Sequence, residues 1–302
     1  KPLTARQIPG RGTAYAILAG VYAWIAGYGQ EPEYYALGIE AAGKVIGDPN
    51  YRLVASPEEV CTEVLPGNSE EGIFEVCYDD SRGEYKDFGS YIGGTVEKWP
   101  VLKGTTPASR RKFFIRNETV ERLYTPEDLR LQAYFADFFR MKEEPVSVTQ
   151  GAAYIRMWRE VEYYSGGIYD GTPRTLLAND ILIRLPDILL LRAEMRAATG
   201  DREGAVADLD VVRRRAGVAG YSEAEGDLRR AIQLERDREL LFQTGVRYFD
   251  YMRNHTYNLL KGGFRDLTEA DVAAGALFLP VSLDAMNNNP KVKQTAYWVG
   301  KF

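Results

Sequence analysis

The sequence predicts a mainly α protein built on tetratricopeptide-like helical hairpins, with long irregular loops and minor β structure. Two observations carry this prediction. Small and apolar residues recur at three- and four-residue steps in two distant stretches, residues 12–47 and 182–216. Between these stretches, residues 79–179 form a loop-rich insertion in which Gly and Tyr are frequent and long regular periods are rare.

The composition is that of a folded globular chain and excludes several functions. Of the 302 residues, 45% are apolar and 27% are charged, and the formal net charge is −5. This balance gives nucleic-acid binding no electrostatic support. No apolar stretch approaches the ~20 residues that span a bilayer. The chain contains 20 Tyr and 4 Trp, which favours a search for a binding surface.

The rarest side chains limit the chemistry further. His255 is the single histidine, so a multi-His zinc site cannot form, and no Gly-x-Ser-x-Gly elbow accompanies it. Its neighbours indicate a surface turn. The two cysteines, Cys61 and Cys77, are compatible with a disulfide or with two free thiols. We expect no cofactor, no metal and no catalytic residue.

The first half of the chain has clear helix boundaries only at its beginning. Residues 12–47 predict two helices separated by Gly27 to Gly29, the second running over 33–46. Residues 73–78 alternate as in a short strand. Thr125, as a cap before Pro126, predicts the start of a helix that reaches Phe139.

The second half has stronger helical patterns. Residues 180–198 are apolar on two sides, and Pro186 places the start of the regular helix near Leu185. A helix over 202–216 follows, with Gly217 as its C-terminal cap. Ser222 and Glu225 form a capping box that predicts a helix to about residue 242. A helical unit over 180–253 and a C-terminal tail over 254–302 complete the chain.

Glu235 and Glu239 lie one turn apart on the last predicted helix. Cβ atoms four residues apart are ~5–6 Å from each other, close to the carboxylate spacing of a retaining glycosidase. Arginines crowd the same region, however, and buried carboxylates are normally paired with arginine. We therefore predict structural ion pairs, formed by Glu194, Glu235, Glu239, Arg247, Asp250 and Arg253.

Aromatic residues in the two irregular regions are the candidate ligand contacts. A flat aromatic face can stack on the C–H face of a sugar ring while neighbouring polar groups bind its hydroxyls. The alternative is that these aromatics hold long loops onto the helical core. The candidates are Trp99, Tyr91, Tyr85, Phe88, Trp158 and Tyr163, and Trp99 is the first choice.

Four stretches together resemble the SusD/RagB family. Residues 232–253 read IQLERDRELLFQTGVRYFDYMR, similar to the family pattern E-R-x-x-E-L-x-F-E-G-x-R-x-x-D-x-x-R. Residues 183–194, 211–217 and 278–294 are similar to three further family motifs in the same order. Gln243-Thr244-Gly245 departs from the usual E-G, and the last motif lacks N-P-G.

The resemblance implies a single SusD-like domain over 1–302 that lacks the N-terminal part of a longer protein. It also implies a non-catalytic lipoprotein on the outer face of the outer membrane in Bacteroidota, held there only by an N-terminal lipid anchor absent from this chain. Such a protein binds oligosaccharides and delivers them to a SusC-like TonB-dependent transporter. The alternatives are a peptide-binding member of the family, a helical-repeat scaffold for a protein partner, and a glycoside hydrolase using Glu235 and Glu239.

Overall fold

A computed structural model describes residues 6–78, 114–159, 161–171, 173–243, 246–260 and 266–301. The α-helices in these ranges are α1 Arg11–Gly27, α2 Tyr34–Ile46, α3 Pro57–Glu59, α4 Asn117–Leu123, α5 Leu129–Tyr134, α6 Phe138–Glu143, α7 Val146–Thr149, α8 Leu185–Thr199, α9 Arg202–Arg215, α10 Leu228–Glu239, α11 Val246–Arg253, α12 Glu269–Ala273 and α13 Leu283–Asn288. The strands are β1 Gly72–Val76, β2 Ile115–Arg116, β3 Ala152–Ala153, β4 Val161–Tyr163, β5 Pro173–Leu176 and β6 Asp180–Arg184.

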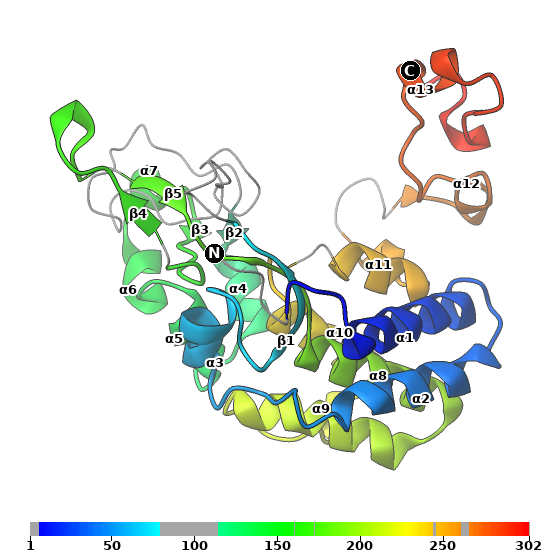
Figure 1. Ribbon diagram of the computed structural model, residues 1–302, viewed down its shortest axis with the longest axis horizontal. Coiled ribbons are helices and arrows are strands. Elements are labelled where there is room, and N and C mark those ends of the chain that lie inside the picture. Colours follow the sequence, from blue (N-terminus) through cyan, green and yellow to red (C-terminus); the bar gives the residue numbers. More distant parts are fainter. Residues whose placement is uncertain are drawn as a thin grey trace.

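Two antiparallel helical hairpins form the main body (Figure 1). Helices α1 and α2 pair with each other, α8 and α9 form the second pair, and α2 packs on α8. Helix α10 lies against α8 and α9. The apolar core between them is built from alanines of α1 and α2 and leucines of α8. The prediction of a mainly α protein with tetratricopeptide-like hairpins is therefore confirmed.

Helix α1 packs closely because its buried face consists of small side chains. Ala16, Ala19, Ala23 and Ala26 are buried at steps of three and four residues. At its end, a Cβ built on Gly27 would lie 2.8 Å from the carbonyl oxygen of Arg253. The close approach of α1 to the end of α11 therefore requires glycine at this position.

Replacing Gly27 with Ala is expected to lower the free energy of unfolding by about 1–3 kcal/mol, because the added methyl meets the backbone of Arg253. Gly20, in the same helix, has no atom within 4 Å of its Cβ position. Gly20→Ala is therefore the matched control and should stabilise by about 0.5–1 kcal/mol. Chemical denaturation measures both. Equal effects of the two substitutions would contradict the close approach.

In the described part of the chain, three two-stranded antiparallel sheets lie beside the hairpins. Strands β1 and β6 pair with Gly72 opposite Arg184 and Val76 opposite Asp180, β2 pairs with β3, and β4 pairs with β5. A second apolar core lies under α3 to α6 on this side of the molecule. The β1–β6 pair brings residue 72 and residue 184 together at the junction of the two cores.

Three predicted element boundaries are wrong. Thr125 does not begin a helix, since α5 starts at Leu129 and Asp128 accepts the hydrogen bond from the amide of Arg130. The Ser222 capping box forms but closes only a 3₁₀ turn, and Asp227 caps α10 instead. The predicted 125–139 helix is divided into α5 and α6 because Phe135 and Asp137 leave the helical conformation.

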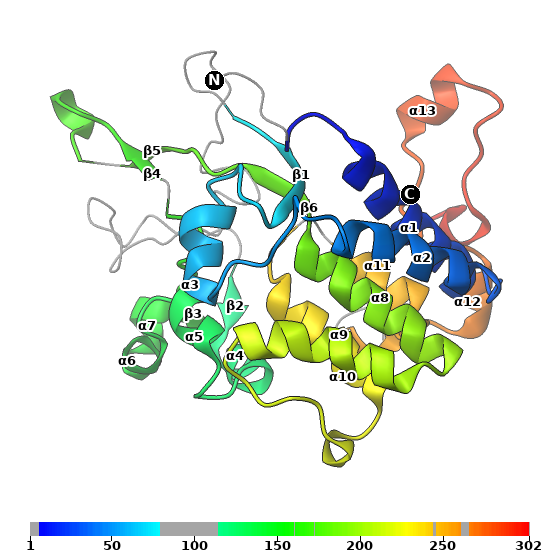
Figure 2. The same cartoon turned by 60° about the horizontal axis from the view of Figure 1, so that its bottom comes forward.

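Helix α13 stands away from the hairpins in both views (Figures 1 and 2). The beginning of the C-terminal tail contacts the end of α1, where the ring of Tyr28 packs against His255 and Phe278. Leu277 packs on Tyr251 and Met252 of α11 and so attaches the beginning of the tail. His255 follows α11 as an exposed residue with φ 53°. Across the described ranges, no helix is both long and apolar enough to cross a membrane.

The two cysteines are free thiols. Cys61 is buried beneath α5, whereas Cys77 follows β1. Burial raises the pKa of Cys61 to about 12, so this thiol stays protonated at neutral pH.

Candidate functional site

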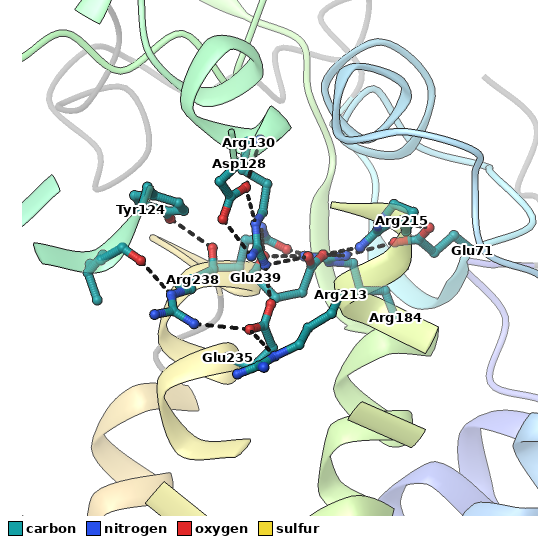
Figure 3. A network of polar contacts seen from close by, with 12 residues as sticks. Glu71, Tyr124, Asp128, Arg130, Arg184, Arg213, Arg215, Glu235, Arg238 and Glu239 are labelled. Atoms are coloured by element: carbon teal, nitrogen blue, oxygen red, sulfur yellow. Dashed lines mark hydrogen bonds and ion pairs between the residues drawn. The ribbon is translucent and has the colours of Figure 1, made fainter. Parts of the chain in front are cut away.

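Helix α10 carries Glu235 and Glu239 into the centre of a buried charge network (Figure 3). Both carboxylates are 0% exposed. Leu228, Ile232 and the two glutamates share the inward face of the helix, as their steps of three and four residues require. The arginine partners come from β6, α5 and α9, which are far apart in the sequence, and Glu71, just before β1, joins the same network.

Glu239 joins three arginines from three elements. Its Oε1 accepts a hydrogen bond from Arg184 Nη1 at 2.6 Å and another from Arg215 Nη2. Its Oε2 lies 3.3 Å from Arg130 Nη1. Glu71 bridges two of the same arginines, with 2.7 Å to Arg184 and 3.0 Å to Arg215. The carboxylate of Glu239 therefore holds the β1–β6 pair, α5 and α9 together.

Glu235 makes a second set of contacts one turn earlier. Arg130 Nη1 donates to Glu235 Oε1 at 2.6 Å, while Arg213 and Arg238 approach Oε2 at 3.3 and 3.2 Å. Arg130 is itself 0% exposed and is held by both oxygens of Asp128 at 2.9 and 2.8 Å. Every carboxylate oxygen of the pair is thus occupied by a guanidinium group.

Electrostatics keeps these carboxylates ionised. Burial by itself would raise the pKa of Glu239, but Arg215, Arg184 and Arg130 lower the pKa to about 2. The pKa of Glu235 is also lowered, because Arg130, Arg238 and Arg213 outweigh the effect of burial. A glycosidase acid needs a raised pKa and access to the substrate. Neither condition is met at this pair.

The four other residues predicted to form ion pairs all have partners of opposite charge. Arg253 binds Glu194 through two bonds of 2.6 and 2.8 Å and also contacts Asp250 at 2.7 Å. Arg236 binds the other oxygen of Asp250 at 2.6 Å. The pKa of Asp250 is lowered, because these two arginines outweigh the effect of burial. This cluster ties α8, α10 and α11 together.

Arg247 lies in a more open environment. Its Nε donates to Asp237 Oδ1 at 2.9 Å, and the hydroxyl of Tyr251 donates to Asp237 Oδ2 at 2.6 Å. Burial raises the pKa of Asp237, and Arg247 counteracts that effect only in part.

The predicted ligand aromatics have different positions. Trp99, Tyr91, Tyr85 and Phe88 lie outside the described residues. Trp158 is 5% exposed and packs in the second apolar core, so its ring has no open face and the prediction that it contacts ligand is wrong. Tyr163, at the end of β4, is 44% exposed, and its contact with a ligand stays a prediction.

A pocket of about 420 Å³ lies between α4 and the α10–α11 connection. Its lining includes Phe114, Arg116, Arg122, Phe242 and Arg247. The sequence reasoning did not single out this place. Thr119 and Arg122 are three residues apart and share one face of the short helix α4, whereas Arg116 ends β2 just before it. Within the described ranges, no group of His, Cys, Asp and Glu side chains could hold a metal ion.

The structure is that of a helical protein whose paired hairpins pack beside a buried arginine–glutamate network on α10. The sequence pattern of the SusD family matches residues 70–298, which is most of the chain. The chain therefore belongs to the SusD family. No curated protein matches it significantly.

Solved structures share the fold of this chain. A SusD homologue from Bacteroides thetaiotaomicron VPI-5482 superposes with a TM-score of 0.81 at 20% identity, covering 99% of this chain and 62% of its own. Surface glycan-binding protein A from Bacteroides uniformis gives a TM-score of 0.67 at 21% identity, covering 94% and 60%. Surface glycan-binding protein A from Bacteroides thetaiotaomicron, in complex with laminarihexaose, gives 0.64 at 21%, covering 93% and 64%. The chain thus spans about three fifths of the length of these structures.

Proposed function

We propose that this protein binds oligosaccharides at the outer surface of the outer membrane and delivers them to a SusC-like TonB-dependent transporter, without catalysis. The observation that carries the proposal is family membership together with a relative of the same fold that is described in complex with laminarihexaose. In this proposal a lipid anchor on the full-length protein holds it at the membrane, as the sequence resemblance implies.

The absence of catalysis is proposed from the carboxylate pair. Glu235 and Glu239 are enclosed by arginines and are fully buried, so a glycosidic bond cannot reach them. Their lowered pKa values are suited to permanent ion pairs and unsuited to proton donation. The pair therefore serves the stability of the fold that carries the binding surface.

Electrophoresis in gels that contain single polysaccharides tests the binding function. At least one polysaccharide should retard the protein. Trp99→Ala should weaken that retardation about fivefold, as expected for the loss of one stacking contact. Trp298→Ala is the matched control, because it removes an indole ring from the C-terminal tail, and it should leave mobility unchanged.

The rival functions predict other outcomes. Release of reducing sugar during incubation with the retarding glycan would indicate a hydrolase. Binding of peptides with no retardation by any glycan would indicate a peptide-binding member of the family. Retardation that is identical in wild type and Trp99→Ala would remove Trp99 from the site and leave glycan binding in place.

A further inference from the structure

The pocket between α4 and the α10–α11 connection is positively charged although the whole chain has a net charge of −5. Among the described residues, four arginines line it against a single carboxylate. Asp237 supplies that carboxylate, and both of its oxygens are already bound by Arg247 and Tyr251. Arg236, in the wall, is bound to Asp250 and Asp187. The charge that is left uncompensated therefore comes from the two arginines of the α4 region.

The backbone positions of Arg116 and Arg122 direct both side chains outward, and no side-chain partner among the described residues fixes them. Arg116 ends β2, where Ile115 points into the core and Arg116 points outward, opposite Ala152 of β3. Val120 and Leu123 bury the other face of α4 and so turn Arg122 to the exposed side. Among the residues that the structure describes, neither guanidinium group has a hydrogen-bond or ion-pair partner within the usual distances.

An aromatic side chain accompanies this positive charge. Phe114 is 42% exposed and lines the same pocket. Phe242, also in the lining, has a φ of 56°, a left-handed conformation that is rare for a bulky residue. The pocket volume of about 420 Å³ is within the range of small-molecule sites. An exposed ring next to unpaired guanidinium groups suits a sugar ring that carries an acidic group.

We propose that this pocket binds the acidic group of an anionic oligosaccharide, with Arg116 and Arg122 holding a carboxylate or sulfate and Phe114 contacting the sugar ring. The inference rests on the proposed function and narrows its ligand class. A neutral sugar would leave both guanidinium groups without a counter-charge, whereas an acidic group accepts charge-assisted and often bidentate hydrogen bonds from arginine. Binding should accordingly weaken as the salt concentration rises.

The test is a binding screen on an array that carries acidic glycans next to neutral counterparts, followed by titration calorimetry. Oligogalacturonate supplies a carboxylate, its methyl ester supplies the same chain without charge, and sulfated galactan oligosaccharides supply a sulfate. The acidic forms should bind at least about tenfold more tightly than their neutral counterparts. Tighter binding of oligogalacturonate would identify the acidic group as a carboxylate, and tighter binding of sulfated galactan would identify it as a sulfate.

Two double variants separate the pocket from general surface charge. Arg116→Gln with Arg122→Gln should reduce affinity for the acidic glycan at least about tenfold and leave the melting temperature unchanged. Arg11→Gln with Arg214→Gln removes the same charge from exposed positions on α1 and α9, and should change affinity less than about twofold.

Each other outcome overturns the inference. Equal binding of acidic and neutral glycans, unchanged affinity of the pocket variant, or equal losses in both variants would exclude the site while glycan binding stands. A lower melting temperature in the pocket variant would show that the arginines pair with the protein's own carboxylates. If no glycan on the array binds, the proposed function fails together with the inference.

Discussion

Replacing Glu239 with Gln is expected to lower the free energy of unfolding by about 3–5 kcal/mol. The substitution preserves shape but removes the negative charge that faces Arg184, Arg215 and Arg130, all of which are buried. The three arginines keep Glu71, Asp128 and Glu235 as neighbours, but the buried network then holds one negative charge fewer. The arginines therefore lose part of the compensation for their desolvation. Urea denaturation followed by circular dichroism measures the change.

Glu223→Gln is the matched control, because it removes the same charge from an exposed ion pair. Glu223 binds Arg202, and its side chain is 79% exposed. Exposed pairs contribute about 0–1 kcal/mol, so this variant should resemble wild type. Similar small effects in both variants would show that the network around Glu239 does not support the fold.

The presence of this network could be predicted from the sequence, but its connections could not. Two glutamates one turn apart on an otherwise apolar face, among arginines, indicate buried ion pairs. The actual partner Arg130 lies 105 residues before Glu235, and Arg184 lies 55 residues before Glu239. Local periodicity contains no information about such distant pairs, which depend on how β6, α5 and α9 meet.

Helix starts were mispredicted where two capping signals compete. Thr125 followed by Pro126 has the features of a cap, yet Asp128 caps α5 because its carboxylate also binds Arg130 in the core. Ser222 and Asp227 present the same choice, and Asp227 begins the long helix. Burial of α5 and α10 against the network decides which signal is used, and a local pattern cannot report that burial.

The ligand contacts were the least predictable feature. Aromatic residues in irregular segments serve equally well as core anchors or as exposed platforms, and Trp158 is an anchor. The pocket arginines were missed because Arg116, at the end of a two-residue strand, and Arg122, on a short helix with mixed charge, resemble any solvated surface. Only the tertiary arrangement shows that Glu121 pairs with Lys142 while Arg116 and Arg122 face a pocket.

Acidification from about pH 4.5 to pH 2 is expected to lower the free energy of unfolding by on the order of 3 kcal/mol through Glu239 alone. The ordinary pKa of 4.5 applies to the unfolded chain, whereas the arginines hold the folded pKa at about 2. A lowered folded pKa stabilises the protein above pH 4.5, and the contribution is lost as the pH falls through the folded value. Glu235 and Asp250, whose pKa values are also lowered, act in the same direction.

Two other buried carboxylates change the free energy of unfolding with pH in the opposite direction. Their effect has to be separated from that of Glu239 by comparing wild type with a variant. Burial raises the pKa of Glu75 and of Asp237, so their ionisation costs stability as the pH rises through their folded pKa values. Measuring wild type and Glu239→Gln by urea denaturation at each pH cancels these contributions. The difference between the two proteins should be large at pH 7 and shrink steadily between pH 4.5 and 2, because protonated Glu239 and Gln are both neutral. A difference that stays constant down to pH 2 would contradict the pairing of ionised Glu239 with Arg184 and Arg215.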